Sequence, residues 1–215
     1  KNKIQINSLD DEFDLLINCS GLQADLTFKN LTKEKRPLKI VPFRGEYYKL
    51  TESAKKLVNH LIYPVGNPKF PFLGVHFTKM INGDREVGPN AVLSLKREGY
   101  RNTDISIPEM YDYITYPGFL KFIGKNFLFC VNEFSTSLLK SSFLNKAKIL
   151  IPELRSEDIY SGPSGVRAQA IKNNGELHMD FEVIRKNNQI HLLNAPSPAA
   201  TASLSIADYI IENYV

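Results

Sequence analysis

The stretch at residues 194–210 (NAPSPAATASLSIADYI) joins small side chains to a predicted helix, directly after an apolar run at 189–193 that is typical of a strand. Ser197 is a residue type that caps helix N–H groups, and Pro198 fits a first helical position because no donor is needed there. Small side chains let a ligand approach the backbone, and a helix N-terminus carries unpaired N–H groups and partial positive charge. The stretch therefore predicts a site for an anion or an electron-rich ring. A plain strand–helix connection is the alternative that these residues leave open.

Composition narrows the function classes. The 215 residues are 43% hydrophobic, which is enough for a packed core in one or two domains. The net charge is +4 and the lysines are scattered, which argues against a nucleic-acid partner. Cys19 and Cys130 are too few and too far apart for a disulfide framework or a zinc site, so we expect two reduced thiols and no metal. No apolar run approaches the roughly 18 residues of a membrane span.

The elements that must position such a site do not alternate as in a parallel sheet. Helices are expected at 107–115, 118–128 and 133–151, and a helix is expected to start near Ser197. Turns are expected at 82–84 and 173–175. Strands are predicted at 3–7, 13–19, 61–64, 72–80, 86–89, 166–171, 182–184 and 189–193, with two more inside 38–50 around Arg44 and Gly45. This order predicts the α+β class, with an antiparallel or mixed sheet and helices.

Neither a G-x-G-x-x-G turn nor a phosphate-loop lysine motif occurs in the sequence. The chain opens at Lys1, without a methionine, directly into a predicted strand. We therefore expect it to be a piece of a longer protein.

Several motifs point to one family. Residues 18–25 (NCSGLQAD) resemble the strand-to-loop motif of FAD-dependent oxidoreductases of the D-amino-acid-oxidase superfamily. Residues 165–169 (GVRAQ) are similar to its late flavin-facing segments. Its substrate domain is resembled by 43–48 (FRGEYY), 72–78 (FLGVHFT) and 87–93 (VGPNAVL). With NAPSPAAT at 194–201, the resemblance narrows to the L-2-hydroxyglutarate oxidases, also called dehydrogenases, and covers essentially the whole chain.

The resemblance implies FAD as cofactor and three regions. Residues 1–30 would be a partial FAD-binding domain, 31–160 the substrate-binding domain, and 161–215 the C-terminal part of the Rossmann-like FAD-binding domain. The family's glycine-rich N-terminal unit, which cradles the pyrophosphate, would be the missing half. Cofactor contacts are implied for Cys19, Gly21, Leu22, Ser197, Pro198, Ala199, Ala200 and Thr201. The last three would offer helix N–H groups to the negative charge of reduced flavin.

The implied substrate is L-2-hydroxyglutarate, a small 2-hydroxy dicarboxylate that is oxidised to 2-oxoglutarate. Arg167 resembles the arginine that binds the substrate carboxylate in relatives, and arginine recognises carboxylate through a two-pronged contact. Arg44 would hold the second carboxylate or else a sheet edge. Tyr47 and Tyr48 alternate across a strand, so only one of them can face the pocket, and Tyr47 is assigned to the substrate. His76 is the candidate base, with a packed core histidine as its alternative.

Two alternative functions remain at this point. One is an amine-oxidising relative of the glycine or sarcosine oxidase type, and the other is an inactive truncated remnant that binds no flavin. The electron acceptor is expected to be oxygen or a quinone at a membrane. Because the two cysteines are expected to be reduced, the protein is expected to be cytoplasmic, and with a quinone acceptor it could be peripheral to the inner membrane.

Overall fold

A computed structural model describes residues 3–6, 9–12, 14–66 and 74–215 of the chain. It separates into two compact units, which are described here one by one. Unit 1 comprises residues 1–41, 116–119 and 168–215, and unit 2 comprises 42–115 and 120–167. The predicted positions 7, 13, 72 and 73 lie outside the described residues.

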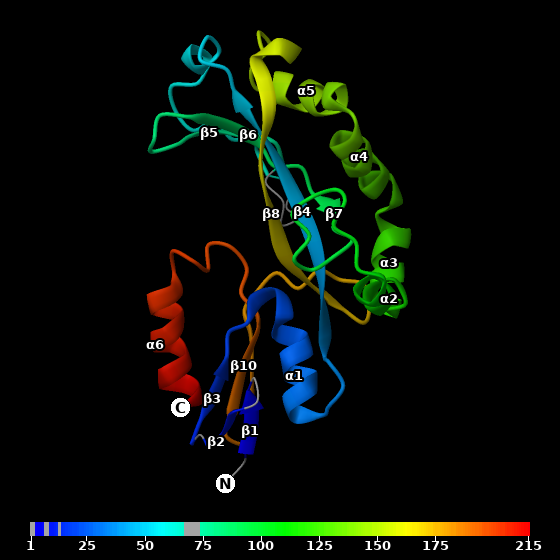
Figure 1. The fold of residues 1–215 in the computed structure, drawn as a ribbon, viewed down its shortest axis with the longest axis vertical. Coiled ribbons are helices and arrows are strands. Elements are labelled where there is room, and N and C mark those ends of the chain that lie inside the picture. Colours follow the sequence, from blue (N-terminus) through cyan, green and yellow to red (C-terminus); the bar gives the residue numbers. More distant parts are fainter. Residues whose placement is uncertain (1–2, 7–8, 13, 67–73) are drawn as a thin grey trace. The chain divides into compact units, whose positions relative to one another are not determined.

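Unit 1 is built on a short mixed sheet in the order β3-β10-β9, of which Figure 1 labels β3 and β10. β3 (Leu16–Asn18) runs parallel to β10 (Gln189–Asn194), which is antiparallel to β9 (Glu182–Lys186). A separate antiparallel pair joins β1 (Lys3–Ile6) to β2 (Leu9–Glu12). The helices are α1 (Ala24–Thr32), preceded by a 3-10 turn at Gly21–Gln23, and α6 (Ser203–Tyr214).

Two small cores hold unit 1 together. α1 packs Ala24 and Phe28 against Leu38, Ile40, Ala170 and Leu193 in one apolar cluster. α6 packs Ile206 and Ile210 against Ile190 and Leu192 of β10 in the other. β10 is therefore the central element of this unit, with buried residues in both clusters.

Unit 2 is built on a five-stranded sheet in the order β5-β6-β4-β7, with β8 also paired to β4. The strands are β4 (Leu38–Leu50), β5 (His76–Lys79), β6 (Arg85–Gly88), β7 (Val92–Leu93) and β8 (Ile159–Lys172). Residues 38–41 of β4 and 168–172 of β8 belong to unit 1. The helices are α2 (Ile107–Ile114), α3 (Pro117–Lys125), α4 (Phe127–Leu138) and α5 (Lys140–Lys148). Two 3-10 turns lie at Lys55–Leu57 and Ser156–Asp158.

One face of this sheet carries the core of unit 2. Phe143 and Ala147 of α5 pack against Phe77 and Val87, and Tyr48 lies against Phe143 at 4.6 Å between ring centroids. Because side chains alternate across a strand, the neighbours of these core residues point to the opposite face.

Several predicted elements differ from the observed ones. The α+β class and both predicted turns are confirmed, with Gly83 and Gly175 at positive φ. The two strands expected around Arg44 and Gly45 are wrong, because β4 runs through without a break. A Cβ on Gly45 would lie 2.7 Å from Cβ of Pro89, so this glycine permits close strand approach instead of a turn.

The region of the two predicted helices at 118–128 and 133–151 forms three helices, α3, α4 and α5, with different boundaries. α3 ends at Lys125 and α4 at Leu138, with Asn126 and Leu139 outside helical geometry. The strand predicted at 61–64 is reduced to a single bridge between Ile62 and Phe77, and β8 begins at Ile159, earlier than the predicted 166. None of the helices in the described residues is long and apolar enough to cross a membrane.

Candidate functional site

The pairing of β3 with β10 brings two distant segments to one sheet edge. The register sets Leu16 opposite Gln189 and Asn18 opposite His191, with the strands parallel. Parallel strands end at the same edge, and ligands of open mixed and parallel sheets bind beyond the carboxyl ends of the strands. Residues 19–22 follow β3 and 195–201 follow β10, so the two predicted cofactor segments leave the sheet at the same edge of unit 1.

The side chains at this edge are small and accessible. Gly21 has a φ of +53° and open space where a Cβ would be. Burial raises the pKa of the Cys19 thiol, so this cysteine is not an activated nucleophile. The predicted contact residues are all exposed or half-buried: Cys19, Gly21, Leu22, Ser197, Pro198, Ala199, Ala200 and Thr201. A flat ligand can therefore reach the backbone on both segments.

A buried polar pair supports the edge from below. Asn18 donates its amide to the carbonyl of Ala24 and to Nδ1 of His191, both at 3.1 Å. Its Oδ1 accepts from the N–H of Ser20 at 3.1 Å and from the Ser20 hydroxyl at 2.6 Å. Nε2 of the fully buried His191 in turn lies 3.0 Å from Oε1 of Gln189. These bonds fix the loop after β3 against β10.

The predicted helix start near Ser197 is wrong. α6 begins at Ser203, and its N-cap position is Ala202, which offers no side-chain cap. The N–H of Ala199 bonds to the carbonyl of Pro196, and the N–H of Thr201 to that of Pro198, both at 3.0 Å. These tight turns occupy donors that a helix start would leave open.

In unit 2, four residues form a row on the sheet face opposite the core. His76 pairs with Gly88, and the register of Tyr48 with Val87 sets Gly88 beside Tyr47. Ile62 bridges Phe77, which sets Tyr63 opposite His76. A Cβ on Gly88 would lie 2.8 Å from the carbonyl oxygen of Glu46, so only a glycine fits here, and no side chain stands between Tyr47 and His76.

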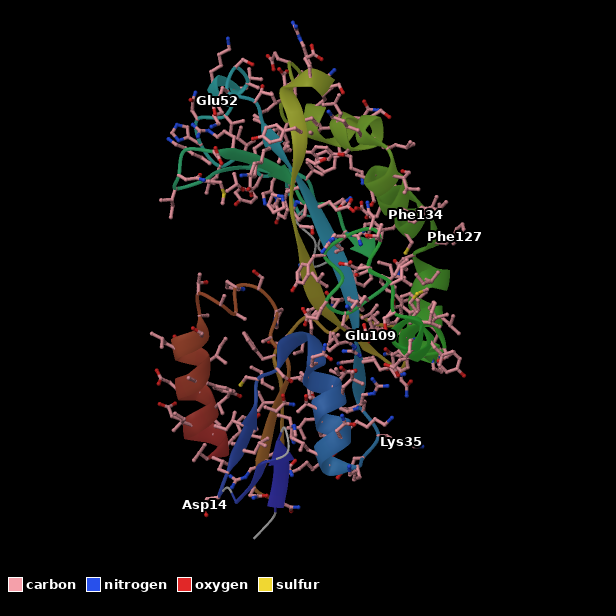
Figure 2. The ribbon with its side chains drawn as sticks, viewed as in Figure 1. Asp14, Lys35, Glu52, Glu109, Phe127 and Phe134 are labelled. Atoms are coloured by element: carbon pink, nitrogen blue, oxygen red, sulfur yellow. The ribbon has the colours of Figure 1, made fainter. Side chains whose placement is uncertain are left out.

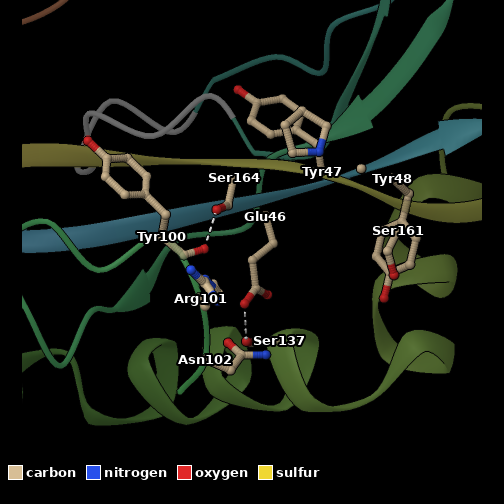
Figure 3. A pocket seen from close by; sticks show the side chains of 11 residues that line it. Glu46, Tyr47, Tyr48, Tyr100, Arg101, Asn102, Ser137, Ser161 and Ser164 are labelled. Carbon is tan, nitrogen blue, oxygen red and sulfur yellow. Dashed lines mark hydrogen bonds between the residues drawn. The ribbon is translucent and has the colours of Figure 1, made fainter. Parts of the chain in front are cut away.

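The two neighbouring tyrosines separate as the alternation predicts. Tyr48 packs on Phe143, whereas Tyr47 is half-buried on the other face. Figure 3 shows Tyr47 and Glu46 on opposite sides of β4. Burial, together with the nearby Glu86 and Tyr63, raises the pKa of Tyr47, so its phenol stays a neutral hydrogen-bond donor.

Arg44 lies on the Glu46 side of β4, away from the row. Its Nε and Nη2 donate to Oε1 of Glu46 at 3.2 and 3.0 Å, and Nη1 donates to the carbonyl of Arg101 at 3.1 Å. Nη2 also donates to Asn102. All three guanidinium nitrogens thus have protein acceptors, which favours the structural role that the sequence left open over the carboxylate role.

Glu46 is a central residue of this unit that sequence reasoning missed. Besides Arg44, its carboxylate accepts from Asn90 Nδ2 at 2.7 Å and from the Ser137 hydroxyl at 3.0 Å, while its N–H donates to Asn90 Oδ1 at 2.8 Å. The spacing of Arg44 and Glu46, two residues apart on one strand face, was the available signal.

Arg167 lies in β8, and its side chain is half-buried. Burial lowers the pKa of its guanidinium, although arginine remains charged at neutral pH. A partly desolvated cation of this kind binds an anion more strongly than an exposed one does.

A shallow cavity of about 210 Å³ opens beside β4 in unit 2. Polar side chains from β4, α4, β8 and the loop at 100–102 line it, including Glu46, Tyr100, Arg101 and Ser137 (Figure 3). Its lining includes the predicted substrate residue Tyr47 as well as Glu46, and does not include His76.

The comparisons with known proteins define the class of the protein. The family described as "FAD dependent oxidoreductase" (DAO) matches residues 3–213, and the chain belongs to this family. Within it, the chain is homologous to L-2-hydroxyglutarate dehydrogenases. The protein of that name from Indibacter alkaliphilus is 48% identical over 198 residues, which cover 92% of this chain and 50% of that protein. The one from Escherichia coli K12 is 43% identical over 200 residues, covering 93% and 47%.

A mitochondrial L-2-hydroxyglutarate dehydrogenase of Bos taurus is 41% identical over 202 residues, covering 92% of this chain and 43% of that protein. This chain therefore spans about half the length of the relatives it matches. Among solved structures, reduced L-α-glycerophosphate oxidase from Mycoplasma pneumoniae with FAD bound has a TM-score of 0.58 and 19% identity. It covers 92% of this chain and 42% of its own, which shows a shared fold.

Proposed function

We propose that a full-length protein containing this chain oxidises L-2-hydroxyglutarate to 2-oxoglutarate with FAD as cofactor. The observation that carries the proposal is 48% identity, over 92% of the chain, to an L-2-hydroxyglutarate dehydrogenase. Unit 1 would be the contribution to the FAD-binding domain and unit 2 the substrate domain.

The edge beyond β3 and β10 has the properties that a flavin requires. Gly21 has no neighbour where a side chain would be, and the 197–201 segment has small residues on an exposed backbone. Cys19–Leu22 and Ser197–Thr201 would hold the ring between them. Flavin would supply the hydride acceptor when bound, and these residues would orient it.

The substrate roles follow from charge and acid–base chemistry. Arg167 would bind a carboxylate through its two-pronged guanidinium, and Tyr47 would donate its phenol to the substrate. His76 would accept the hydroxyl proton as hydride leaves the carbon. Arg44 would act through Glu46, by holding the β4 segment from which Tyr47 projects.

Substrate-dependent bleaching of the flavin tests this function. The full-length protein, held without oxygen, should lose its visible flavin absorbance on addition of L-2-hydroxyglutarate and release 2-oxoglutarate. Sarcosine and glycine should leave the spectrum unchanged. Bleaching by the amines alone would support the amine-oxidising alternative, and a colourless full-length protein would support the inactive remnant.

We further propose that unit 2 binds a membrane surface through the outer face of α4. Phe127, Val131, Phe134 and Leu138 repeat at helical spacing and are about half to two-thirds exposed. Figure 2 shows Phe127 and Phe134 on the outer side of α4. The polar face of α4 instead points inward, where Glu133 accepts from the N–H of Ala91 at 2.9 Å. Soluble proteins rarely expose such a contiguous apolar patch.

The charges around this apolar face suit an anionic bilayer. The preceding helix α3 carries exposed Lys121 and Lys125, and the acidic Glu133 of α4 is turned away. The full-length protein should float with vesicles containing one-third phosphatidylserine. Phe127→Ser/Phe134→Ser should abolish flotation, while Tyr160→Ser, another exposed aromatic, should not. Equal flotation of both variants would contradict the proposed membrane face.

A further inference from the structure

Tyr63 lies outside the motifs that carry the resemblance, yet it packs directly on the candidate base. Two backbone bonds join its segment to β5, from Ile62 N to Phe77 O at 3.0 Å and from Phe77 N to Ile62 O at 2.9 Å. This pairing sets Tyr63 opposite His76. The two rings are stacked at 4.5 Å between centroids with 25° between planes.

A backbone carbonyl fixes which nitrogen of His76 carries the proton. Nδ1 lies 2.9 Å from the carbonyl oxygen of Gly74. A carbonyl oxygen only accepts hydrogen bonds, so in the neutral ring Nδ1 is protonated and Nε2 keeps its lone pair. Gly74 has a φ of +77°, a conformation that glycine adopts without steric cost where the chain enters β5.

We propose that Tyr63 is a positioning residue, which holds the His76 imidazole by stacking so that Nδ1 stays on the Gly74 carbonyl and Nε2 stays available as the base. Stacking restricts the plane of the ring, and the hydrogen bond to the Gly74 carbonyl selects one of the two flipped orientations of the ring in that plane. The inference deepens the proposed function, because it rests on His76 accepting the proton of a hydroxy acid.

The charged and titratable groups around His76 are compatible with this role. Tyr47 and Lys49 project from β4 on the same face, and Glu86 projects from β6. Tyr47 is a neutral phenol at physiological pH because its pKa is raised. Tyr63 is 46% exposed, so replacing it leaves the buried core residues of the opposite face in place.

A pair of substitutions separates the ring from its hydroxyl in the full-length flavoprotein. Tyr63→Phe keeps the stacking ring and should keep kcat within about twofold. Tyr63→Leu removes it, and kcat for L-2-hydroxyglutarate should fall by about tenfold or more, a fraction of what general base catalysis supplies. KM should change little, and the acidic limb of the pH profile of kcat should move. Tyr111→Leu, at a tyrosine 71% exposed, is the matched control.

Nitrogen NMR of the labelled full-length protein gives a second readout that needs no turnover. His76 should be almost entirely the Nδ1–H tautomer in wild type and Tyr63→Phe, and mixed in Tyr63→Leu. An unchanged tautomer and unchanged kcat in Tyr63→Leu would overturn the positioning role even if the enzyme is fully active. If wild type shows no activity on hydroxy acids but Tyr63→Leu still changes the tautomer of His76, the proposed function would be overturned and the positioning of His76 by Tyr63 would stand.

Discussion

At the residue scale, unit 2 depends on a buried ion pair with unusually complete hydrogen bonding. The side chains of Arg44 and Glu46 are 6% and 19% exposed, and each makes further hydrogen bonds to other protein groups. Breaking such a pair strands one charge away from water, which costs far more than the pair itself contributes. The pair is consequently a stability determinant of the strand that carries Tyr47.

Removing Arg44 tests this dependence. Arg44→Met should lower the free energy of unfolding of unit 2 by up to about 3–5 kcal/mol, because Glu46, whose side chain is 19% exposed, is left without its counter-charge. Adding Glu46→Gln should recover part of the loss, since a neutral amide needs no counter-charge. Urea denaturation followed by tyrosine fluorescence measures both variants.

The control for this prediction is Arg155→Met. Arg155 pairs with Glu157 at 4.0 Å, and the two side chains are 74% and 71% exposed. Its removal should change stability by no more than about 0.5 kcal/mol. Equal losses at Arg44 and Arg155 would contradict the buried-pair account.

A second prediction at the residue scale concerns substrate binding by Arg167. In the full-length flavoprotein, Arg167→Ala should raise KM for L-2-hydroxyglutarate by about one to two orders of magnitude, the loss of roughly 1.5–3 kcal/mol from a charge-assisted two-pronged contact. Flavin content should be unchanged. Arg101→Ala, at an exposed arginine, is the control, and steady-state kinetics that do not differ between the two variants would remove the carboxylate role.

The sequence predicted the direction of a side chain where that direction follows from the alternation of residues along a strand. It did not predict contacts between residues that are far apart in the chain. The opposite orientations of Tyr47 and Tyr48 followed from the period of a strand. The hydrogen bonds from Arg44 to Asn102 and to the carbonyl of Arg101 could not be predicted in this way, because they join residues more than fifty positions apart. The stacking of Tyr63 on His76 was hidden for a related reason, since a single bridge places it there.

At the element scale, the parallel pair of β3 and β10 is what creates the candidate cofactor edge. Its stability depends on a neutral His191. Burial lowers the pKa of His191 below its ordinary value of 6.5, and Asn18 donates to Nδ1, which requires that nitrogen to be unprotonated.

This dependence predicts a loss of stability on acidification. The unfolded state binds a proton at higher pH than the folded state, so the contribution is complete above pH of about 6.5 and declines as pH falls below it. Unfolding free energies measured between pH 7.5 and 5 should therefore decrease in wild type. His191→Gln should be less stable at neutral pH and show a smaller decrease, whereas His60→Gln, at an exposed histidine, should follow wild type. A slope unchanged by His191→Gln would exclude the histidine as its source.

Element boundaries show which local signals were outweighed. Strand 189–193 was predicted within one residue, because its apolar run is bounded by polar and proline-containing segments. α1 was not predicted, although Ala24 and Phe28 have the i, i+4 spacing of a buried helix face. Its first turn carries Asp25, which is fully buried, pairs with Arg36 at 2.8 Å and accepts from the N–H of Ile40 at 3.2 Å. In the sequence alone, an aspartate at this position is typical of an exposed loop, because its buried partners Arg36 and Ile40 lie further along the chain.

At the scale of the whole molecule, the chain divides by contact instead of by sequence order. Unit 1 collects residues from three separated ranges, and the chain passes between the units at 41/42, 115/116, 119/120 and 167/168. The first and last of these points fall inside β4 and β8. The resemblance implied borders after residues 30 and 160. The assignment of unit 1 to FAD binding and unit 2 to substrate binding remains a proposal, which rests on the family.

Cofactor retention is the prediction that belongs to the whole molecule. Unit 1 offers the two segments that would face the flavin ring, but the 215-residue sequence contains no glycine-rich turn to hold a pyrophosphate on a helix N-terminus. The ring edge alone supplies few charged contacts, since Cys19–Leu22 and Ser197–Thr201 are uncharged. We therefore expect the isolated chain to leave gel filtration with little FAD, and a full-length protein containing it to leave with one FAD per chain. Absorbance near 450 nm against protein concentration measures both, and adding free FAD to the isolated chain at rising concentration extends the comparison. Stoichiometric flavin on the isolated chain would show that the β3–β10 edge binds the ring without the pyrophosphate site.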